Sequence, residues 1–368
     1  MNAPVIRADR TPLQRTLADF RTPLLYNQWY VAGYCEDFGE ALTERMLLNR
    51  SLVFYRTSTG EPVAFQNRCA HRAYPLAKSW REGDSIRCRY HGAKYNSDGE
   101  MTDVPCQEHC PKVKLRKYPL REQGPLVWIW MGDPDKAESV PLPETPFLIR
   151  EDGWEFCTGS FHMEGNYLLM MENLMDLTHL PFLHRDSFAF PPEYAAIPIE
   201  VETNGTQLRY ARIGGANNKF HHRKGFFPED MVERFDTEPY HVEGIGEFVN
   251  PGFTYGRSEF QSLEPKEGMQ NVFQTRVIHF LTPETDTTTH YWYFHARNYA
   301  QDNKAHTEKV RATLAKGFAE DMEAVADLQR LLTTDNHVYR EVHFAGDKPT
   351  VAMRRIVARM AEAEQAGG

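Results

Sequence analysis

Short apolar runs at strand-like spacing dominate the first third of the chain. Runs rich in β-branched and aromatic residues, such as 52–55, 63–65 and 126–130, are separated by turn clusters of serine, threonine, asparagine, aspartate and glycine. Short strands at this spacing are typical of all-β domains. The pattern therefore predicts a small β-sandwich over about residues 24–132.

A different pattern begins after a proline-rich segment. Residues 133–147 contain four prolines, a density that favours an extended connector between domains. Beyond the connector, helical periodicity alternates with strand-like runs, which predicts an α+β domain with helices packed on an antiparallel sheet. The helices are expected over about 163–180, 303–332 and 350–364, and the strands near 207–212, 272–281 and 288–296.

Composition limits the class of protein. The 368 residues are too many for one ordinary core and suggest two domains, at roughly 150 residues per domain. Apolar residues at 41% and charged residues at 25% exclude wholesale disorder and fibrous repeats. With 42 basic against 51 acidic side chains, the formal net charge is −9, so nucleic acid is not an expected partner.

No apolar stretch is long enough to cross a membrane. A bilayer requires about 20 apolar residues, and the longest runs, such as 125–131, are far shorter. The first 20 residues interleave charged and apolar side chains, unlike the apolar core of a signal peptide. The sequence therefore predicts a cytoplasmic protein with no membrane partner. Its six cysteines are too sparse for a disulfide scaffold.

Two short motifs place cysteine and histidine together. Cys69 and His71 form a C-x-H pair, Cys88 and His91 form a C-x-x-H pair, and sixteen residues separate the pairs. Structural zinc accepts such ligands, but zinc fingers place both cysteines in one pair and both histidines in the other. Here each pair supplies one of each, as in a Rieske [2Fe–2S] site, where one iron takes two cysteines and the other takes two histidines. Structural zinc stays open as the alternative.

A second group of candidate ligands lies near residue 180. His179 and His184 are five residues apart, and on a regular helix they would point roughly 140° apart, which prevents them from sharing a metal. Pro181 removes a backbone donor between them, so we expect it to bend the helix and bring the second imidazole round. Asp176, three residues before His179, is expected on the same face, where its carboxylate can orient that imidazole.

A carboxylate would complete the two-His, one-carboxylate set of non-haem Fe(II) oxygenases. On the predicted helix over 303–332, Asp321 lies on the apolar stripe with Phe318 and Val325, whereas Glu320 and Glu323 are expected to point elsewhere. A carboxylate on a buried face needs a partner, and iron would be one. The alternative is a boundary aspartate paired with a lysine or arginine.

With both groups in this order, the chain resembles the oxygenase component of the Rieske non-haem iron oxygenases over essentially its whole length. The resemblance implies an α+β protein with a helical arm over 1–23, an N-terminal Rieske β-sandwich domain over 24–143 and a C-terminal helix-grip catalytic domain over 144–368. On the family's positions fall the cluster ligands Cys69, His71, Cys88 and His91, the iron ligands His179, His184 and Asp321, and the supporting residues Asn173 and Asp176.

Within this family, the segments 173–179, 281–284 and 318–321 look most like the vanillate and dicamba O-demethylase subgroup. Ring-dihydroxylating members usually carry His-Gly-Trp after the second cluster cysteine, whereas this chain has alanine at position 93, which favours the monooxygenase branch. The subgroup implies a homotrimer that receives NAD(P)H-derived electrons through a separate reductase or ferredoxin.

The activity implied by the resemblance is O- or N-dealkylation of a small aromatic substrate with O₂, through a [2Fe–2S] cluster and a mononuclear Fe(II). Ring hydroxylation or cis-dihydroxylation by the same machinery is the alternative, because fold and ligands do not separate these outcomes. Two non-enzymatic alternatives are an electron carrier fused to a ligand-binding domain and a zinc-stapled binding protein. Neither has a use for an open two-His, one-carboxylate site.

The resemblance also gives Asp176 a role between subunits. In the family, the cluster of one protomer faces the iron of its neighbour in a closed trimer. One carboxylate oxygen of Asp176 would then hold His179, while the other accepts a hydrogen bond from His91 of the partner subunit.

The substrate pocket is expected on the strands over 274–281 and 289–295. His279 and Trp292 are the candidate substrate contacts, although alternation along a strand leaves open which face each of them takes. Residues 214–246 look like an extra or divergent stretch relative to shorter demethylases, and substrate identity is expected to be decided there.

Overall fold

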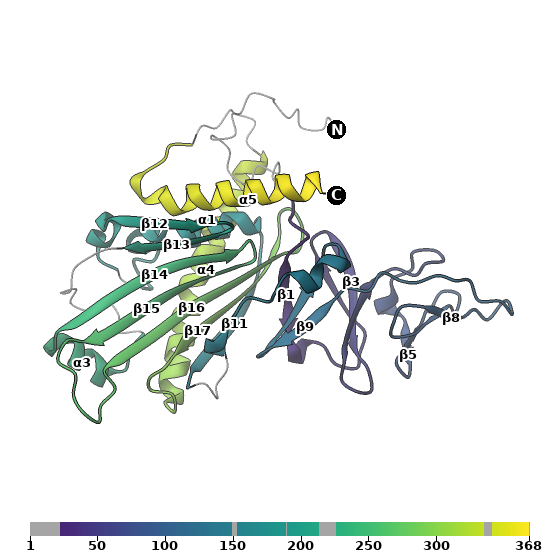
Figure 1. Cartoon of the computed structure of the whole chain (residues 1–368), viewed down its shortest axis with the longest axis horizontal. Coiled ribbons are helices and arrows are strands. Elements are labelled where there is room, and N and C mark those ends of the chain that lie inside the picture. The colour runs from purple at the N-terminus through teal and green to yellow at the C-terminus, as the bar shows by residue number, and fades with distance from the viewer. Residues whose placement is uncertain (1–22, 149–152, 189, 213–225, 335–340, 368) are drawn as a thin grey trace.

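The computed structural model of the chain describes residues 23–148, 153–188, 190–212, 226–334 and 341–367. A group of short strands and a larger C-terminal sheet stand side by side, and the helices α4 (Lys304–Thr334) and α5 (Lys348–Ala366) lie against the larger sheet (Figure 1). The arm predicted over residues 1–23 falls almost entirely outside the described residues.

In the described part of the N-terminal half, ten strands form three antiparallel sheets. In the first sheet, the central strand β10 (Leu126–Trp130) is buried at every residue, because neighbours cover both its edges and both its faces. The sheets contain β1 (Trp29–Tyr34), β10 (Leu126–Trp130) and β9 (Leu120–Gln123); β2 (Thr43–Leu47), β3 (Arg50–Arg56) and β4 (Pro62–Gln66); and β5 (Trp80–Glu82), β6 (Ser85–Arg87), β7 (Lys94–Tyr95) and β8 (Met101–Asp103).

The apolar run in β3 shows why these strands form. Leu52 and Phe54 join the core that continues into the C-terminal domain, whereas Val53 and Tyr55 join a separate core under the sheet of β5 to β8. Successive side chains of a strand point to opposite faces. Because both faces are covered, the strand reads as a continuous apolar run rather than an alternating one.

The C-terminal half contains a seven-stranded antiparallel sheet within the described residues. Its order is β11-β17-β16-β15-β14-β13-β12, so every pair except β11–β17 joins strands that are neighbours in the sequence. The three predicted strand runs correspond to β13 (Gln207–Arg212), β16 (Val272–Pro283) and β17 (Thr289–Arg297), while β11 (Glu155–Met163), β12 (Ile199–Asn204), β14 (Tyr240–Asn250) and β15 (Phe253–Ser262) complete the sheet.

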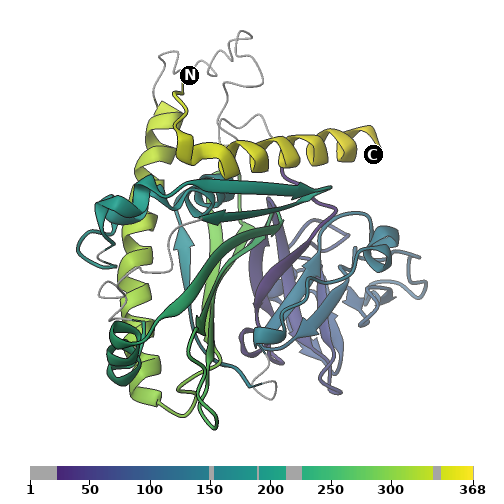
Figure 2. The same ribbon diagram turned by 60° about the vertical axis from the view of Figure 1, so that its left-hand side comes forward.

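Helices cover one face of this sheet. Helix α4 runs along the face and contacts β11 and α1 (Tyr167–Met175), and α5 lies across β12 and β13 at the sheet edge (Figures 1 and 2). Val310, Leu314 and Phe318 form the buried side of α4. The other described α-helices are α2 (Leu180–Leu183) and α3 (Glu229–Thr237). This arrangement confirms the predicted fold class, an N-terminal β domain followed by a sheet-and-helix domain.

The two halves share a continuous aromatic core. Trp29 and Trp128 of the N-terminal strands pack with Phe280 and Trp292 on the face of the large sheet opposite α4. In addition, the Glu364 carboxylate near the C-terminus accepts hydrogen bonds from the backbone N–H groups of residues 26 and 27. Among the described helices, none combines the length and apolar character that a bilayer-spanning segment needs.

Candidate functional site

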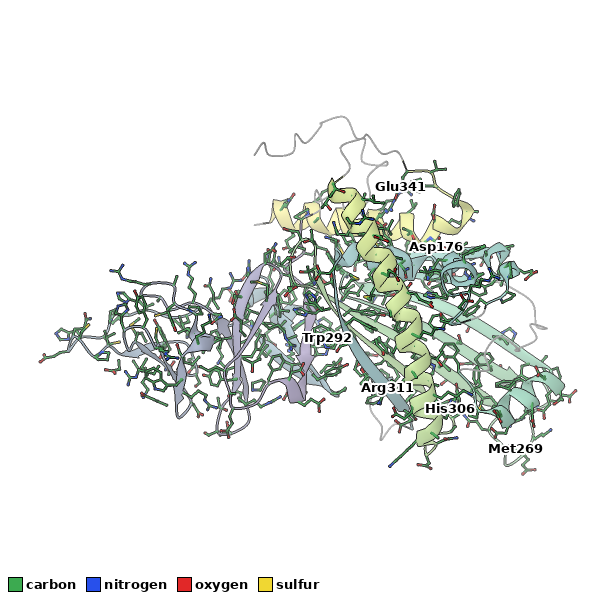
Figure 3. All side chains as sticks on the ribbon, turned by 180° about the vertical axis from the view of Figure 1, so that it is seen from behind. Asp176, Met269, Trp292, His306, Arg311 and Glu341 are labelled. Carbon is green, nitrogen blue, oxygen red and sulfur yellow. The ribbon has the colours of Figure 1, made fainter. Side chains whose placement is uncertain are left out.

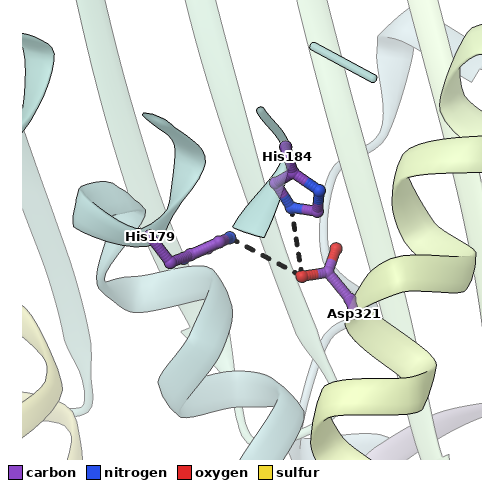
Figure 4. Close-up of side chains that lie close together, drawn as sticks. All are labelled: His179, His184 and Asp321. Atoms are coloured by element: carbon purple, nitrogen blue, oxygen red, sulfur yellow. Dashed lines mark ion pairs between the residues drawn. The ribbon is translucent and has the colours of Figure 1, made fainter. Parts of the chain in front are cut away.

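Two imidazoles and one carboxylate converge between the helices and the sheet. One ligand atom from each of His179, His184 and Asp321 lies within 4.8 Å of the others (Figure 4). The Asp321 Oδ1 atom lies 3.2 Å from His184 Nε2 and 3.6 Å from His179 Nε2. The side chains of His184 and Asp321 are 0% and 2% exposed. Three such donors facing one point form the facial set that binds Fe(II) in non-haem oxygenases.

The chain conformation before His184 explains how both imidazoles reach one point. Helix α1 ends at Met175, and Asp176 adopts an extended conformation with φ −116° and ψ 92°. A short 3₁₀ helix, Leu177–His179, leads into α2. The break therefore lies at Asp176. The prediction that Pro181 bends the helix is wrong. Pro181 occupies the first turn of α2, where its missing N–H would have no intrahelical partner and costs nothing.

The break also changes which atom of Asp176 orients His179. The His179 Nδ1 atom donates to the backbone oxygen of Asp176 at 2.7 Å, which directs Nε2 toward Asp321. The Asp176 carboxylate instead accepts from the backbone N–H of Thr178 at 2.9 Å and lies 3.6 Å from an Arg212 nitrogen. The prediction that this carboxylate holds His179 is therefore wrong within the chain, because Asp176 caps the 3₁₀ helix instead of continuing the face of α1.

A carboxylate that the sequence prediction dismissed holds the other imidazole. The His184 Nδ1 atom donates to Glu320 Oε2 at 2.8 Å, and the Ser187 hydroxyl donates to the same oxygen at 2.6 Å. Adjacent residues on a helix point about 100° apart, which lets Glu320 and Asp321 reach opposite nitrogens of one ring. The two adjacent acidic residues Glu320 and Asp321 in the predicted helix were the sequence signal that could have revealed this role. Hydrogen bonds of this kind fix the orientation of a metal-binding histidine and raise its basicity.

Asn173 supports the third donor. Its Nδ2 atom donates to Asp321 Oδ1 at 2.9 Å from the last turns of α1. The structure therefore brings the predicted supporting residue Asn173 onto the carboxylate of Asp321.

Burial and neighbouring charge act on the two imidazoles in opposite directions. Burial lowers the pKa of His179, and the Asp321 carboxylate only partly offsets this effect. Burial also acts to lower the pKa of His184, but the Asp321 and Glu320 carboxylates outweigh it and raise the pKa. The His184 Nε2 atom is buried and has no hydrogen-bond partner among the described residues. An unpaired buried nitrogen beside a buried carboxylate fits the coordination of a divalent metal such as iron.

A largely apolar cavity of about 240 Å³ adjoins the three donors. One wall is formed by α1, α2 and α4, and the opposite wall by strands β13 to β17. Aromatic and aliphatic side chains provide most of the lining, and polar side chains and glycines provide the rest, as is typical of a small-molecule site. The aromatic lining includes Phe188, Phe190, Tyr194, Phe226 and Phe318, and the polar lining includes His279, His295 and Arg212.

His279 faces this cavity with a defined tautomer. Its Nδ1 atom lies 2.7 Å from the buried Tyr291 hydroxyl. Among the described residues, that hydroxyl has no other acceptor, so Tyr291 donates and the proton of the neutral imidazole lies on Nε2. Burial lowers the pKa of His279 to about 3, which keeps the ring neutral at physiological pH. His279 can therefore offer an N–H donor to a polar group in the cavity.

Trp292 does not line the cavity. It pairs with Phe280 across β16 and β17 and packs against the N-terminal domain, where Figure 3 shows it beside the N-terminal strands. The cavity lies on the face of β17 to which His295 points. The prediction of a substrate contact is therefore wrong for Trp292, because strand alternation directs it to the opposite face.

The four cysteine and histidine ligands predicted in the N-terminal domain come from two adjacent loops. The rings of His71 and His91 lie 4.6 Å apart between centroids and are exposed, whereas Cys69 and Cys88 are 2% and 1% exposed. The Tyr95 hydroxyl accepts from a backbone N–H and lies 3.2 Å from the Cys69 sulfur, so it can donate to that sulfur when the cysteine is a thiolate. Two buried sulfurs beneath two exposed imidazoles fit a Rieske cluster.

The loop that contains Cys88 and His91 has a backbone conformation that can hold a charged sulfur. Burial raises the pKa of the Cys88 thiol, and the backbone N–H groups of Tyr90 and His91 act in the opposite direction by donating to the sulfur. Gly92 has φ +79°, and a Cβ there would lie 2.7 Å from Pro105. Glycine is therefore required for the backbone to wrap around this sulfur.

Comparisons with known proteins agree with both sites. Residues 28–119 match the Rieske [2Fe-2S] domain family, and residues 163–363 match the vanillate O-demethylase oxygenase C-terminal domain family. The chain is 33% identical to a toluene-4-sulfonate monooxygenase system iron-sulfur subunit of Comamonas testosteroni, covering 83% of this chain and 88% of that protein. It is 28% identical to the oxygenase component of a chloroacetanilide N-alkylformylase of Rhizorhabdus wittichii, covering 92% and 96%.

A dicamba O-demethylase component is similar to this chain in sequence, and a dicamba monooxygenase structure is similar to it in fold. The oxygenase component of a dicamba O-demethylase from Stenotrophomonas maltophilia is 25% identical, with 92% of this chain and 98% of that protein covered. A crystal structure of dicamba monooxygenase bound to 3,6-dichlorosalicylic acid superposes with a TM-score of 0.78 at 24% identity, covering 94% of this chain and 99% of that chain. This last likeness concerns the fold.

Proposed function

This chain belongs to the Rieske oxygenases with a vanillate O-demethylase type of catalytic domain, and on that premise we propose that it dealkylates an aromatic compound at an oxygen or nitrogen atom. It is a Rieske-type non-haem iron monooxygenase. The observation that carries the proposed reaction is the position of the His179, His184 and Asp321 donors at the wall of an aromatic-lined cavity. Relatives named as O-demethylase and N-alkylformylase components support the reaction class.

Two groups of residues would hold the cofactors. Cys69, Cys88, His71 and His91 would bind the [2Fe–2S] cluster, and His179, His184 and Asp321 would bind the mononuclear iron. When bound, these groups supply electron storage and O₂ activation.

The protein's own residues position the substrate and exclude water. Aromatic rings of the cavity would enclose the substrate ring, and the His279 N–H would hold a polar substituent. Insertion of an oxygen atom into a C–H bond beside an ether oxygen or amide nitrogen gives a hemiacetal or hemiaminal. This product collapses spontaneously and releases an aldehyde, so no further protein group has to break the carbon–heteroatom bond.

Electron delivery requires partners. A reductase or ferredoxin would pass NAD(P)H-derived electrons to the cluster held by the N-terminal domain. The sheet of β5 to β8 lies at the end of the N-terminal domain away from α4 (Figure 1), which favours transfer to the iron of a partner subunit in a homotrimer. In that arrangement Asp176 would link the two sites. A cytoplasmic location follows from the need to share a compartment with NAD(P)H and the reductase.

The test is anaerobic purification followed by a panel of methoxy-aryl and N-alkyl-anilide compounds with a reductase and NAD(P)H. We expect about three irons and about two acid-labile sulfides per chain, and one aldehyde per NAD(P)H for an accepted substrate. Asp321→Ala should lose the mononuclear iron and aldehyde release while keeping the Rieske spectrum. Ring cis-diols as the only products across the panel would contradict dealkylation.

A further inference from the structure

Three glycines lie next to one another in the sheet wall of the cavity. Gly246 of β14 pairs with Gly256 of β15, and the next pair facing the same way is Gly244 with Ser258. All four residues line the cavity. The middle of this wall therefore carries almost no side chain of its own, whereas neighbouring cavity-facing positions carry side chains such as Tyr210, Val277 and His279.

The three glycines differ in what covers them. A Cβ at Gly246 would lie 2.1 Å from the Tyr210 ring, so this ring already fills the space over Gly246. Tyr210 is fixed there, because it is buried and its hydroxyl donates to the Leu174 backbone oxygen at 3.0 Å. By contrast, a Cβ at Gly244 or Gly256 would meet no atom of the described residues within 4 Å. These two positions leave a hollow beside Tyr210.

The hollow enlarges the cavity on the side opposite the helices that supply the metal donors. Val277 bounds it on β16, where it pairs with Gly256. An engineered apolar cavity of about 150 Å³ holds one benzene molecule, and the cavity here is about 240 Å³. The available space therefore exceeds one unsubstituted ring.

We propose that Gly244 and Gly256 set the size of the substrate, and that the accepted class is aromatic compounds larger than one ring, such as fused or para-extended rings. The reacting group faces the donors on the helix wall, and the far end of the substrate lies on the bare backbone of the two glycines. The proposal rests on the proposed function in one respect, namely that this cavity is the substrate site.

The two glycines are suited to a clean test. Neither has a positive φ, so alanine can adopt the same backbone conformation. Gly→Ala replacements of this kind stabilise a fold by restricting the unfolded chain. Loss of folding is therefore not the expected result, and the thermal midpoint should equal or exceed that of the unmodified protein. Gly39→Ala is the matched control, since a Cβ at Gly39 also meets no described atom within 4 Å but lies in the N-terminal domain, outside the cavity.

The experiment measures dissociation constants by calorimetry for the full-length holoenzyme with para-methoxybenzoate as the one-ring probe and para-methoxybiphenyl carboxylate as the two-ring probe. The unmodified protein and Gly39→Ala should bind the two-ring probe at least as tightly as the one-ring probe. The double variant Gly244→Ala, Gly256→Ala should weaken the two-ring probe about tenfold and the one-ring probe by less than about twofold.

Equal weakening of both probes, no weakening, or failure of the unmodified protein to bind the two-ring probe would each overturn the assignment. The binding measurement is independent of turnover. Size selectivity without aldehyde release would refute the dealkylation reaction alone, whereas aldehyde release without size selectivity would refute the role of the glycines alone.

Discussion

The His184 imidazole lies between the carboxylates of Glu320 and Asp321 on α4. Its Nδ1 atom donates to Glu320 at 2.8 Å, and its Nε2 atom lies 3.2 Å from Asp321. Both contacts come from one turn of a single helix, so the position of α4 fixes the ring in two directions. Because Nδ1 is engaged, Nε2 is left as the coordinating atom.

Glu320→Ala should weaken binding of the mononuclear iron by about 10-fold to about 100-fold, the usual effect of removing a partner of a metal-binding histidine. The Rieske absorption should not change, because that site lies in the other domain. Iron titration of the apoprotein followed by absorption and metal analysis provides the measurement. Glu323→Ala is the control, since Glu323 is exposed on the same helix. Equal iron affinity in the two variants would show that the contact with His184 has no effect on binding.

Cys69→Ser or His91→Ala should bleach the Rieske cluster while leaving the mononuclear site able to bind iron. The first change replaces a buried sulfur that lies 3.2 Å from the Tyr95 hydroxyl, and the second removes an exposed ring. Visible absorption and electron paramagnetic resonance of the reduced protein would follow the loss. Cys106→Ser serves as the control because Cys106 is exposed and outside the two loops. Stoichiometric zinc with no labile sulfide in the unmodified protein would contradict the cluster assignment.

The fold and the metal ligands were predictable because each leaves a local pattern. Strands buried on both faces read as apolar runs, and Asp321 interrupts a helical apolar stripe where a carboxylate needs a partner. Both features depend on residues close in the sequence. The resemblance to a known family then combined the two patterns into one enzyme.

The remaining parts of the site depend on geometry that local patterns do not contain. The break at Asp176 was assigned to Pro181, because proline is a strong signal and an extended aspartate is not. Glu320 was expected to point away from the site, because its contact with His184 depends on how α4 packs in the fold. The face of Trp292 could not be chosen because both faces of β17 are buried. Part of the sheet wall of the cavity consists of glycines, which carry no side chain to suggest a function.

Acid should destabilise the fold through its buried neutral histidines. Burial, with Arg297 and His306 adding like charge, lowers the pKa of His295 to about 3 from 6.5. The unfolded state therefore binds a proton more readily than the folded state. The contribution to stability is complete above pH 6.5, and it is lost as the pH falls from there toward 3.

At about pH 5, the loss for His295 should be about 2 kcal/mol relative to pH 7. Chemical denaturation at both pH values measures the difference in the free energy of unfolding. His295→Asn should reduce this difference by about the same amount, while the exposed His241→Asn should leave it unchanged. An unaltered pH dependence in His295→Asn would show that His295 does not titrate between the folded and unfolded states.

The last prediction separates the two possible roles of Asp176. Its backbone oxygen orients His179. Its carboxylate is 25% exposed and, among the described residues, bonds only to Thr178, with Arg212 3.6 Å away. Asp176→Asn retains the backbone oxygen, so the mononuclear iron should stay bound with unchanged affinity. It also removes a charge and turns one acceptor into a donor, so a hydrogen bond from His91 of the partner subunit would be lost. Electron transfer between subunits should then fail in an enzyme that still holds both metals.

The measurement is a single turnover in which the cluster is reduced chemically, substrate and O₂ are added, and re-oxidation is followed by absorption. Asp186→Asn makes the same chemical change at an exposed position ten residues further along and should re-oxidise like the unmodified protein. Re-oxidation of Asp176→Asn at that same rate would restrict Asp176 to capping the 3₁₀ helix.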